Sequence, residues 1–232
     1  MKSETVYLVA GAKPWSRRAY EEMLTRYPGK WEYVEMPDQL AAEHIVQINP
    51  RYIFFLHWSW KVPQKILENY ECVCFHMTDV PYGRGGSPLQ NLILRGHRST
   101  KLSALRMTAE FDAGPVYMKK DLSLEGGAEE IYLRASYLSA EMIIELIEKT
   151  PVPVSQQGKI TLFERRKMKE SSISGGRSLG ELYDFIRMLD AEGYPKAFIE
   201  RQGFRYEFSR AGIYDGCIKA DVTITMAERS DR

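Results

Sequence analysis

A histidine, a proline and a cluster of glycines follow one another in the segment CFHMTDVPYGRGGSPLQN, which runs from Cys74 to Asn91. An apolar strand that ends at His76 would deliver one imidazole into a loop whose glycines let the backbone approach a ligand closely. An imidazole has a pKa of about 6.5, so it can take up or release a proton near neutral pH. The segment therefore predicts proton transfer at a strand end, and a tight turn without a ligand is the alternative.

A second polar residue of interest, Asp112, lies in the segment ALRMTAEFDAGPV, directly before a Gly-Pro pair. A carboxylate beside an imidazole can orient the ring and raise its basicity. Aspartate is also common in turns for the conformation of the turn alone. The local sequence leaves both roles open for Asp112.

Short apolar runs that alternate with helical segments must position these two residues. Apolar runs without period-two alternation indicate strands buried on both faces, as in a parallel sheet. We predict an α/β fold, a Rossmann-like and mostly parallel sheet with flanking helices. Strands are expected at residues 6–10, 31–36, 52–56, 73–75, 102–107 and 114–118.

Ligands of such sheets bind at the carboxyl ends of the strands. His57 ends one predicted strand and His76 ends the next, so both are expected on the functional rim. A strongly amphipathic helix then begins near Glu129 and ends before Pro151. Its apolar stripe is expected to be part of the core.

The chain is predicted to divide into residues 1–150, a catalytic domain, and residues 151–232, a small C-terminal α+β appendage. The polar stretch at 155–158 is expected to be a linker. The appendage has a capping-box signal at Ser178 and alternating residues at 204–208 and 222–224, which predict one helix and two strands.

Composition restricts the partners. The formal net charge of +1 provides no basic footprint, which argues against a nucleic-acid partner. No segment resembles a signal peptide or the roughly 20 apolar residues of a membrane span, so we expect a cytoplasmic protein without a membrane partner. Neither the three cysteines nor the four histidines have ligand spacing, and no metal is predicted.

Taken together, the two motifs resemble those of the 10-formyltetrahydrofolate-dependent formyltransferase family, in which a strand ends in Asn-x-His, an Arg-Gly-x-x-Pro loop follows and an Asp-x-Gly loop completes the site. The segments TLFERRKMKESSISGG and LYDFIRMLDAEGYPKAFI resemble parts of the nucleotide-sugar N-formyltransferases, of the type that acts on a UDP-linked 4-amino-4,6-dideoxy sugar. The resemblance covers most of the chain.

The resemblance implies roles for individual residues. His76 and Asp112 match the catalytic pair, and Cys74 stands where the family has its asparagine. An asparagine would donate to the oxyanion of the reaction, whereas a thiol is a poor donor. A nucleophilic Cys74 that forms a formyl thioester is a further alternative. The residues expected to hold 10-formyltetrahydrofolate as co-substrate are Arg84, Gly85, Gly86, Pro88, Phe111 and Gly114.

The resemblance also suggests the acceptor. The expected partner is the amine of a nucleotide-linked amino sugar used in bacterial surface glycan biosynthesis, with Arg165 and Arg166 on its diphosphate and Tyr194 on its base. Two alternatives stay open: a folate- or nucleotide-sugar-binding protein without catalysis, and a formyltransferase acting on another amine such as methionyl-tRNA. A homodimer is also compatible with the sequence.

Overall fold

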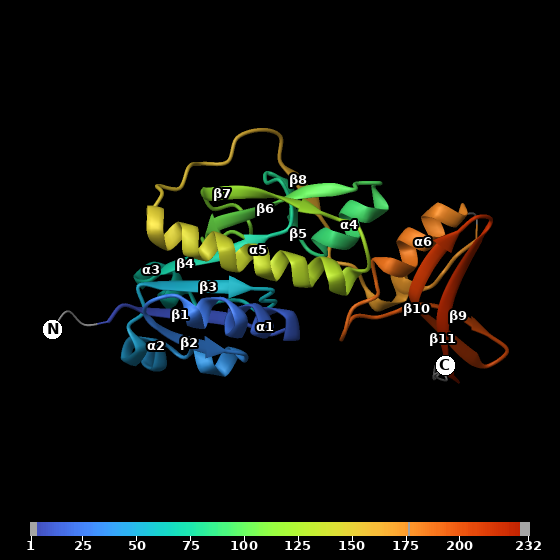
Figure 1. The fold of residues 1–232 in the computed structure, drawn as a ribbon, viewed down its shortest axis with the longest axis horizontal. Helices are drawn as coiled ribbons and strands as arrows, with labels where there is room; N and C mark the ends of the chain where they lie inside the picture. Colours follow the sequence, from blue (N-terminus) through green and yellow to red (C-terminus); the bar gives the residue numbers. More distant parts are fainter. Residues whose placement is uncertain (1–3, 176, 228–232) are drawn as a thin grey trace. The chain divides into compact units, whose positions relative to one another are not determined.

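The central sheet is built from the apolar runs of the first half of the chain (Figure 1). The computed structural model describes residues 4–175 and 177–227. The sheet has six strands in the order β2-β1-β3-β4-β6-β7. These strands are β1 (Val6–Gly11), β2 (Lys30–Val34), β3 (Tyr52–Leu56), β4 (Glu71–His76), β6 (Ser99–Arg106) and β7 (Val116–Ser123).

Strand direction confirms the predicted, largely parallel sheet. β1 pairs in parallel with both β2 and β3, and β3 pairs in parallel with β4. On its other side, β4 pairs antiparallel with β6, where Cys74 lies opposite Leu105 and His76 opposite Ser103. β4 is therefore an inner strand with hydrogen-bonded neighbours on both sides.

Helices bury both faces of this sheet. On one face, α2 (Ala42–Ile48) and α3 (Gln64–Asn69) contribute Ile45 and Ile66 to a core with residues of β1 and β3. Val9 and Phe54, which point to the other face, are also fully buried. Burial on both faces explains why these strands are apolar without alternation.

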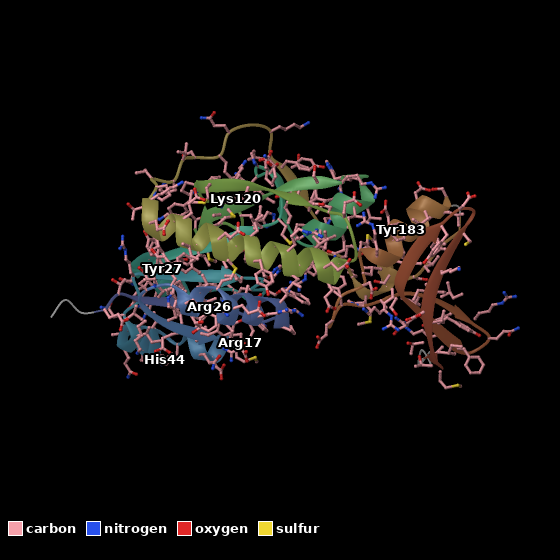
Figure 2. The ribbon with its side chains drawn as sticks, in the orientation of Figure 1. Arg17, Arg26, Tyr27, His44, Lys120 and Tyr183 are labelled. Carbon is pink, nitrogen blue, oxygen red and sulfur yellow. The ribbon has the colours of Figure 1, made fainter. Side chains whose placement is uncertain are left out.

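Helices α1 (Pro14–Glu22) and α5 (Ala128–Lys149) lie along the sheet (Figure 1) and contact each other. The rings of Trp15 and Tyr132 stack with centroids 5.1 Å apart. Lys120, labelled on β7 in Figure 2, pairs with Glu145 of α5 at 2.9 Å. The predicted amphipathic helix is thus α5, and its apolar residues are in the core.

The C-terminal segment forms the predicted α+β arrangement. Its antiparallel sheet has the order β11-β10-β9, from β9 (Ala197–Arg201), β10 (Phe204–Tyr214) and β11 (Cys217–Met226). α6 (Leu179–Arg187) begins with the predicted capping box, in which the Ser178 side chain accepts from the Glu181 amide. Both predicted strands are longer than expected, and β9 was not predicted.

The remaining elements are short. They are α4 (Pro88–Leu94), the two-stranded pair β5 (Tyr82–Gly85) and β8 (Thr161–Phe163), and the 3-10 turns Leu24–Arg26, Pro37–Leu40 and Met168–Ser171. Among the described residues, no helix combines the length and apolar character needed to cross a bilayer.

Contacts divide the chain into two compact units, each made of several segments. The first comprises residues up to Gly85, Thr100–Leu122 and Tyr132–Leu162. The second comprises Gly86–Ser99, Ser123–Ile131 and the chain from Phe163 onward. The boundary expected between residues 150 and 151 remains a prediction about the domains.

Candidate functional site

His76 is the last residue of β4, and its ring is held from one side by the loop that follows. The Nε2 atom donates to the backbone carbonyl of Gly83 at 2.7 Å. Thr78 Oγ1 donates to the same carbonyl at 3.3 Å. Gly83 has a φ of +76°, a backbone conformation that favours glycine. The glycine loop therefore fixes the orientation of the imidazole.

Asp112 faces the other nitrogen of the ring. Its Oδ1 atom lies 3.5 Å from Nδ1 of His76. Its Oδ2 atom accepts the backbone N–H of Gly85 at 2.9 Å. Asp112 itself has a φ of +53°, in the left-handed region that few residues with side chains adopt. The loop thus holds an unfavourable backbone conformation at the residue that meets the histidine.

This arrangement defines where a proton can be held. Because Nε2 of His76 donates to the Gly83 carbonyl, Nδ1 is the ring atom left to exchange a proton. A proton on Nδ1 would lie between the ring and the Asp112 carboxylate. Both side chains are largely enclosed, with 9% of His76 and 18% of Asp112 exposed. The pair is suited to general acid–base chemistry.

Gly114 shows how tightly the Asp112 loop packs. A Cβ atom at this position would lie 1.8 Å from the carbonyl oxygen of Arg106. No real side chain tolerates such a distance to backbone, so glycine is required for close approach. The Asp-x-Gly spacing therefore has a steric cause in this chain.

A cleft opens beside Asp112 within the first unit. It has a volume of about 540 Å³, which includes open solvent at its mouth. Most of its walls are apolar, and Phe111 stands 71% exposed beside it. The lining includes Trp60, Val62, Leu67, Cys74, Leu105, Met107, Phe111, Asp112 and Gly114. An apolar cleft with a few polar groups at one end is typical of small-molecule sites.

Cys74 lies in the wall of this cleft. Burial raises the pKa of its thiol, and the nearby charge of Asp112 raises it further. The thiolate, which is the nucleophilic form, is therefore disfavoured. The environment argues against the alternative in which Cys74 forms a formyl thioester, and it leaves Cys74 as a neutral, weak donor.

His57 follows β3 as predicted, but its ring packs into an aromatic cluster. The ring centroids of Trp15 and Tyr132 lie 5.8 Å and 5.2 Å away. Its Nε2 atom lies 3.1 Å from Ser136 Oγ. Burial lowers the pKa of His57 to about 4. His57 thus lies at a strand end as predicted, but its neighbours are aromatic rings and a serine hydroxyl, and no carboxylate pairs with it as Asp112 does with His76.

In the second unit, two of the predicted acceptor residues meet at Ser87. The backbone N–H of Arg166 donates to Ser87 Oγ at 3.0 Å, and the Tyr194 hydroxyl donates to the same atom at 3.3 Å. The guanidinium of Arg166 lies over the ring of Phe185. These contacts hold the turn at Ser87, which has a φ of +49°. A role of Arg166 and Tyr194 toward an acceptor remains a prediction.

The other predicted residues of the second unit lie beside this turn. A Cβ atom on Gly86 would lie 2.5 Å from Cβ of Arg165, so glycine permits this close contact. Pro88 is the first residue of α4, a position that suits its fixed φ. Arg84, predicted with them, is buried in the first unit, where it lies near Glu110.

Two parts of the site were missed by sequence reasoning. The segment from Trp60 to Leu67 lines the cleft, and Gln156 bonds to the Asp112 loop. Trp60 and Gln156 both lie in irregular segments without periodicity, and the polar stretch around Gln156 was interpreted as a linker. The only local indication that this segment could line a cleft is the apolar character of Trp60 and Val62.

A solved structure is similar over nearly the whole chain. It is methionyl-tRNA formyltransferase from Clostridium thermocellum, 46% identical, with a TM-score of 0.91 over 96% of this chain and 100% of that one. The chain belongs to the formyltransferase family. The family model "Methionyl-tRNA formyltransferase, C-terminal domain" also matches residues 168–225.

Other similar proteins are more distant. Methionyl-tRNA formyltransferase from Thermodesulfovibrio yellowstonii is 27% identical over 163 residues, 66% of this chain. The chain spans about half the length of that curated relative, 52%. The structure of HypX from Aquifex aeolicus in complex with tetrahydrofolic acid shares the fold, with 18% identity and a TM-score of 0.72 over 90% of this chain and 38% of that one.

These similarities confirm the family and correct the acceptor. The use of 10-formyltetrahydrofolate by this chain is part of the function proposed below. The predicted nucleotide-sugar acceptor and the placement nearest to sugar N-formyltransferases are wrong, because the similar proteins are methionyl-tRNA formyltransferases. The predicted absence of a nucleic-acid partner is wrong for the same reason. The net charge adds up all charged residues and therefore does not reveal a local basic run. Residues 165–169 form such a run, with four basic side chains in five positions.

Proposed function

We propose that this chain transfers the formyl group of 10-formyltetrahydrofolate to the amine of methionyl-tRNA. The observation that carries the reaction type is the pairing of His76 Nδ1 with Asp112 Oδ1 at 3.5 Å, beside an apolar cleft. The acceptor is supported by the similarity to methionyl-tRNA formyltransferases. We retain a cytoplasmic location as part of the proposal.

The cleft fits the flat, heteroaromatic part of a folate. Its apolar walls, with Trp60 and Val62 on one segment and Phe111 on another, suit a planar ring system. The backbone groups of the loop from Met107 to Gly114 supply polar edges. We propose this cleft as the folate site, in which a bound 10-formyltetrahydrofolate supplies the formyl carbon.

His76 and Asp112 then have separate tasks. An amine that attacks a formyl carbon must lose a proton, and His76 Nδ1 is the ring atom free to receive it. Asp112 stabilises the positive charge of the imidazole after the transfer, when Nδ1 carries the proton. Gly85 fixes the carboxylate through its backbone N–H. Cys74 is too weak a donor to replace the amide of an asparagine.

Exposed cations in the second unit are available to an acceptor rich in phosphate. Arg165, Lys167 and Lys169 are exposed and lie within five positions. Lysine and arginine contacts to phosphates provide most of the affinity of proteins for nucleic acids and make it dependent on salt. We include these three residues in the proposed contact with tRNA.

The test is a formyl-transfer assay with the full chain, 10-formyltetrahydrofolate and methionyl-tRNA, in which formylmethionyl-tRNA is measured directly. We expect transfer that falls as salt rises, because tRNA contacts are electrostatic. Free methionine and uncharged tRNA serve as acceptor controls, and His76→Ala serves as the catalytic control. A chain that binds folate but leaves methionyl-tRNA unmodified would refute the proposal and favour a binding protein.

A further inference from the structure

The side-chain amide of Gln156 ties together the two loops of the proposed active site. Its Nε2 atom donates to the carbonyl oxygens of Asp112 and Gly114, at 2.8 Å each. Its Oε1 atom accepts from Nε of Arg84 at 3.0 Å. Arg84 directly precedes Gly85, whose N–H bonds to the Asp112 carboxylate. These hydrogen bonds therefore connect Gln156, residues 84–85 and the Asp112 loop in a closed circuit.

The partners determine which way the amide points. Two backbone carbonyls can only accept, and Nε of Arg84 can only donate. A glutamine satisfies all three partners at once, with its NH₂ group on the carbonyls and its oxygen on the guanidinium. A glutamate of the same size would keep the bond to Arg84 and place an acceptor against Asp112 O and Gly114 O.

The backbone around Gln156 is anchored close to the site. Two residues earlier, Val154 exchanges backbone hydrogen bonds with Val116 at 2.8 Å in both directions. Val116 is the first residue of β7 and follows the Asp112 loop by a few positions. The side chain of Gln156 thus extends from a fixed point onto the loop that it bonds.

Asp112 needs this support for two reasons. Its left-handed backbone conformation, with a φ of +53°, is unfavourable for a residue with a side chain. Its carboxylate has to face His76 and Gly85 at the same time. A loop free to relax toward a commoner conformation would turn the carboxylate away from the imidazole. The two bonds from Gln156 hold the carbonyl of this strained residue and the carbonyl of Gly114, two residues later.

We propose that Gln156 is a positioning residue of the formyl-transfer reaction, which acts through Asp112 by holding its loop against His76. This inference rests on the proposed function. It assigns a role in the chemistry to a residue that lies in a polar segment and does not contact the reacting atoms.

The test compares Gln156→Glu with Gln157→Glu, which makes the same change of charge at the exposed neighbouring residue. We expect kcat to fall about tenfold in Gln156→Glu and to stay within about twofold in Gln157→Glu. In an Asp112→Asn background, adding Gln156→Glu should change kcat by less than about twofold, because a residue that acts through Asp112 has nothing left to position. Gln156→Met, of similar size and uncharged, provides the same comparison if Gln156→Glu fails to fold.

A second measurement needs no substrate. Hydrogen exchange of the Gly85 amide, which is bonded to Asp112, should be about tenfold faster in Gln156→Glu than in the unmodified protein. The inference would be overturned if Gln156→Glu lowered kcat equally in the unmodified protein and in the Asp112→Asn background. It would also be overturned if hydrogen exchange of the Gly85 amide were unchanged in Gln156→Glu. Unmodified protein without any transferase activity would instead defeat the proposed function, and the exchange measurement would still decide whether Gln156 holds the loop.

Discussion

The ends of two neighbouring strands, β3 and β4, carry histidines in very different surroundings. His76 after β4 has a carbonyl on one nitrogen and a carboxylate facing the other. His57 after β3 has two aromatic rings and a serine hydroxyl. The strand position alone therefore does not make a histidine a proton-transfer residue. The carboxylate that faces His76 makes the difference.

The two environments also differ in the charged groups that face the ring. Around His57, burial without a carboxylate partner lowers the pKa to about 4, so the ring is neutral at pH 7. Around His76, the carboxylate of Asp112 compensates a positive charge whenever one forms. His57 packs among aromatic rings, whereas His76 faces a carboxylate that stabilises a positive charge during a reaction.

The largest expected effect comes from removing each ring in turn. His76→Ala should lower kcat by about 10²- to 10⁴-fold, the usual contribution of a general acid or base. His57→Gln, which retains a polar side chain, should leave kcat within about threefold, because His57 packs against Trp15 and Tyr132 and has no carboxylate partner. Steady-state kinetics of both variants measure the contrast. Similar losses in the two would show that the comparison is mistaken.

The next effect concerns stability and pH. His57 titrates at about 4 when folded and at about 6.5 when unfolded, so the unfolded chain binds more protons between these values. The free energy of unfolding should therefore fall as pH is lowered from 6.5 to 4, by up to about 3 kcal/mol from this residue. Urea unfolding at several pH values measures the slope. His57→Gln should flatten it, whereas His44→Gln, at an exposed position on α2 (Figure 2), should not.

The smallest effect tests the serine that contacts His57. Ser136 is fully buried, and Ser136→Ala would leave Nε2 of His57 without that partner. We expect a loss of about 1–2 kcal/mol in the free energy of unfolding and an unchanged kcat. Ser139→Ala is the matched control, since Ser139 is buried on the same helix but bonds to its own backbone at Ala135. A change in kcat only in Ser136→Ala would connect His57 to the active site after all.

Much of the sheet could be predicted because burial on both faces leaves a direct mark on the sequence. The apolar runs that became β1, β3 and β4 have this mark. The antiparallel direction of β6 could not be predicted, because a buried strand has the same residue types in either direction. β10 and β11 were predicted too short, although Asp215-Gly216 between them is a strong signal for a two-residue hairpin turn.

Residues of the site could be predicted from the sequence only where they belong to a recognisable motif. His76 and Asp112 were singled out on their own segments, and the structure brings their side chains together. Gln156 could not be found in this way, because its partners lie 42 to 72 positions away in the chain and its own segment has no pattern. The nucleotide-sugar acceptor is predicted from the resemblance of two C-terminal segments, and a nucleic-acid partner is excluded on total charge, which contains no information on where the charges lie.

Position 112 also constrains how this chain can evolve. Its left-handed backbone is tolerated by glycine, asparagine and aspartate better than by other residues. Its place opposite His76 asks for a negative charge, which glycine and asparagine lack and glutamate would supply only on a longer, poorly tolerated side chain. Aspartate alone meets both demands. The backbone conformation and the required charge therefore each limit which residues can replace Asp112. If one requirement were lost, the other would still limit substitution at this position.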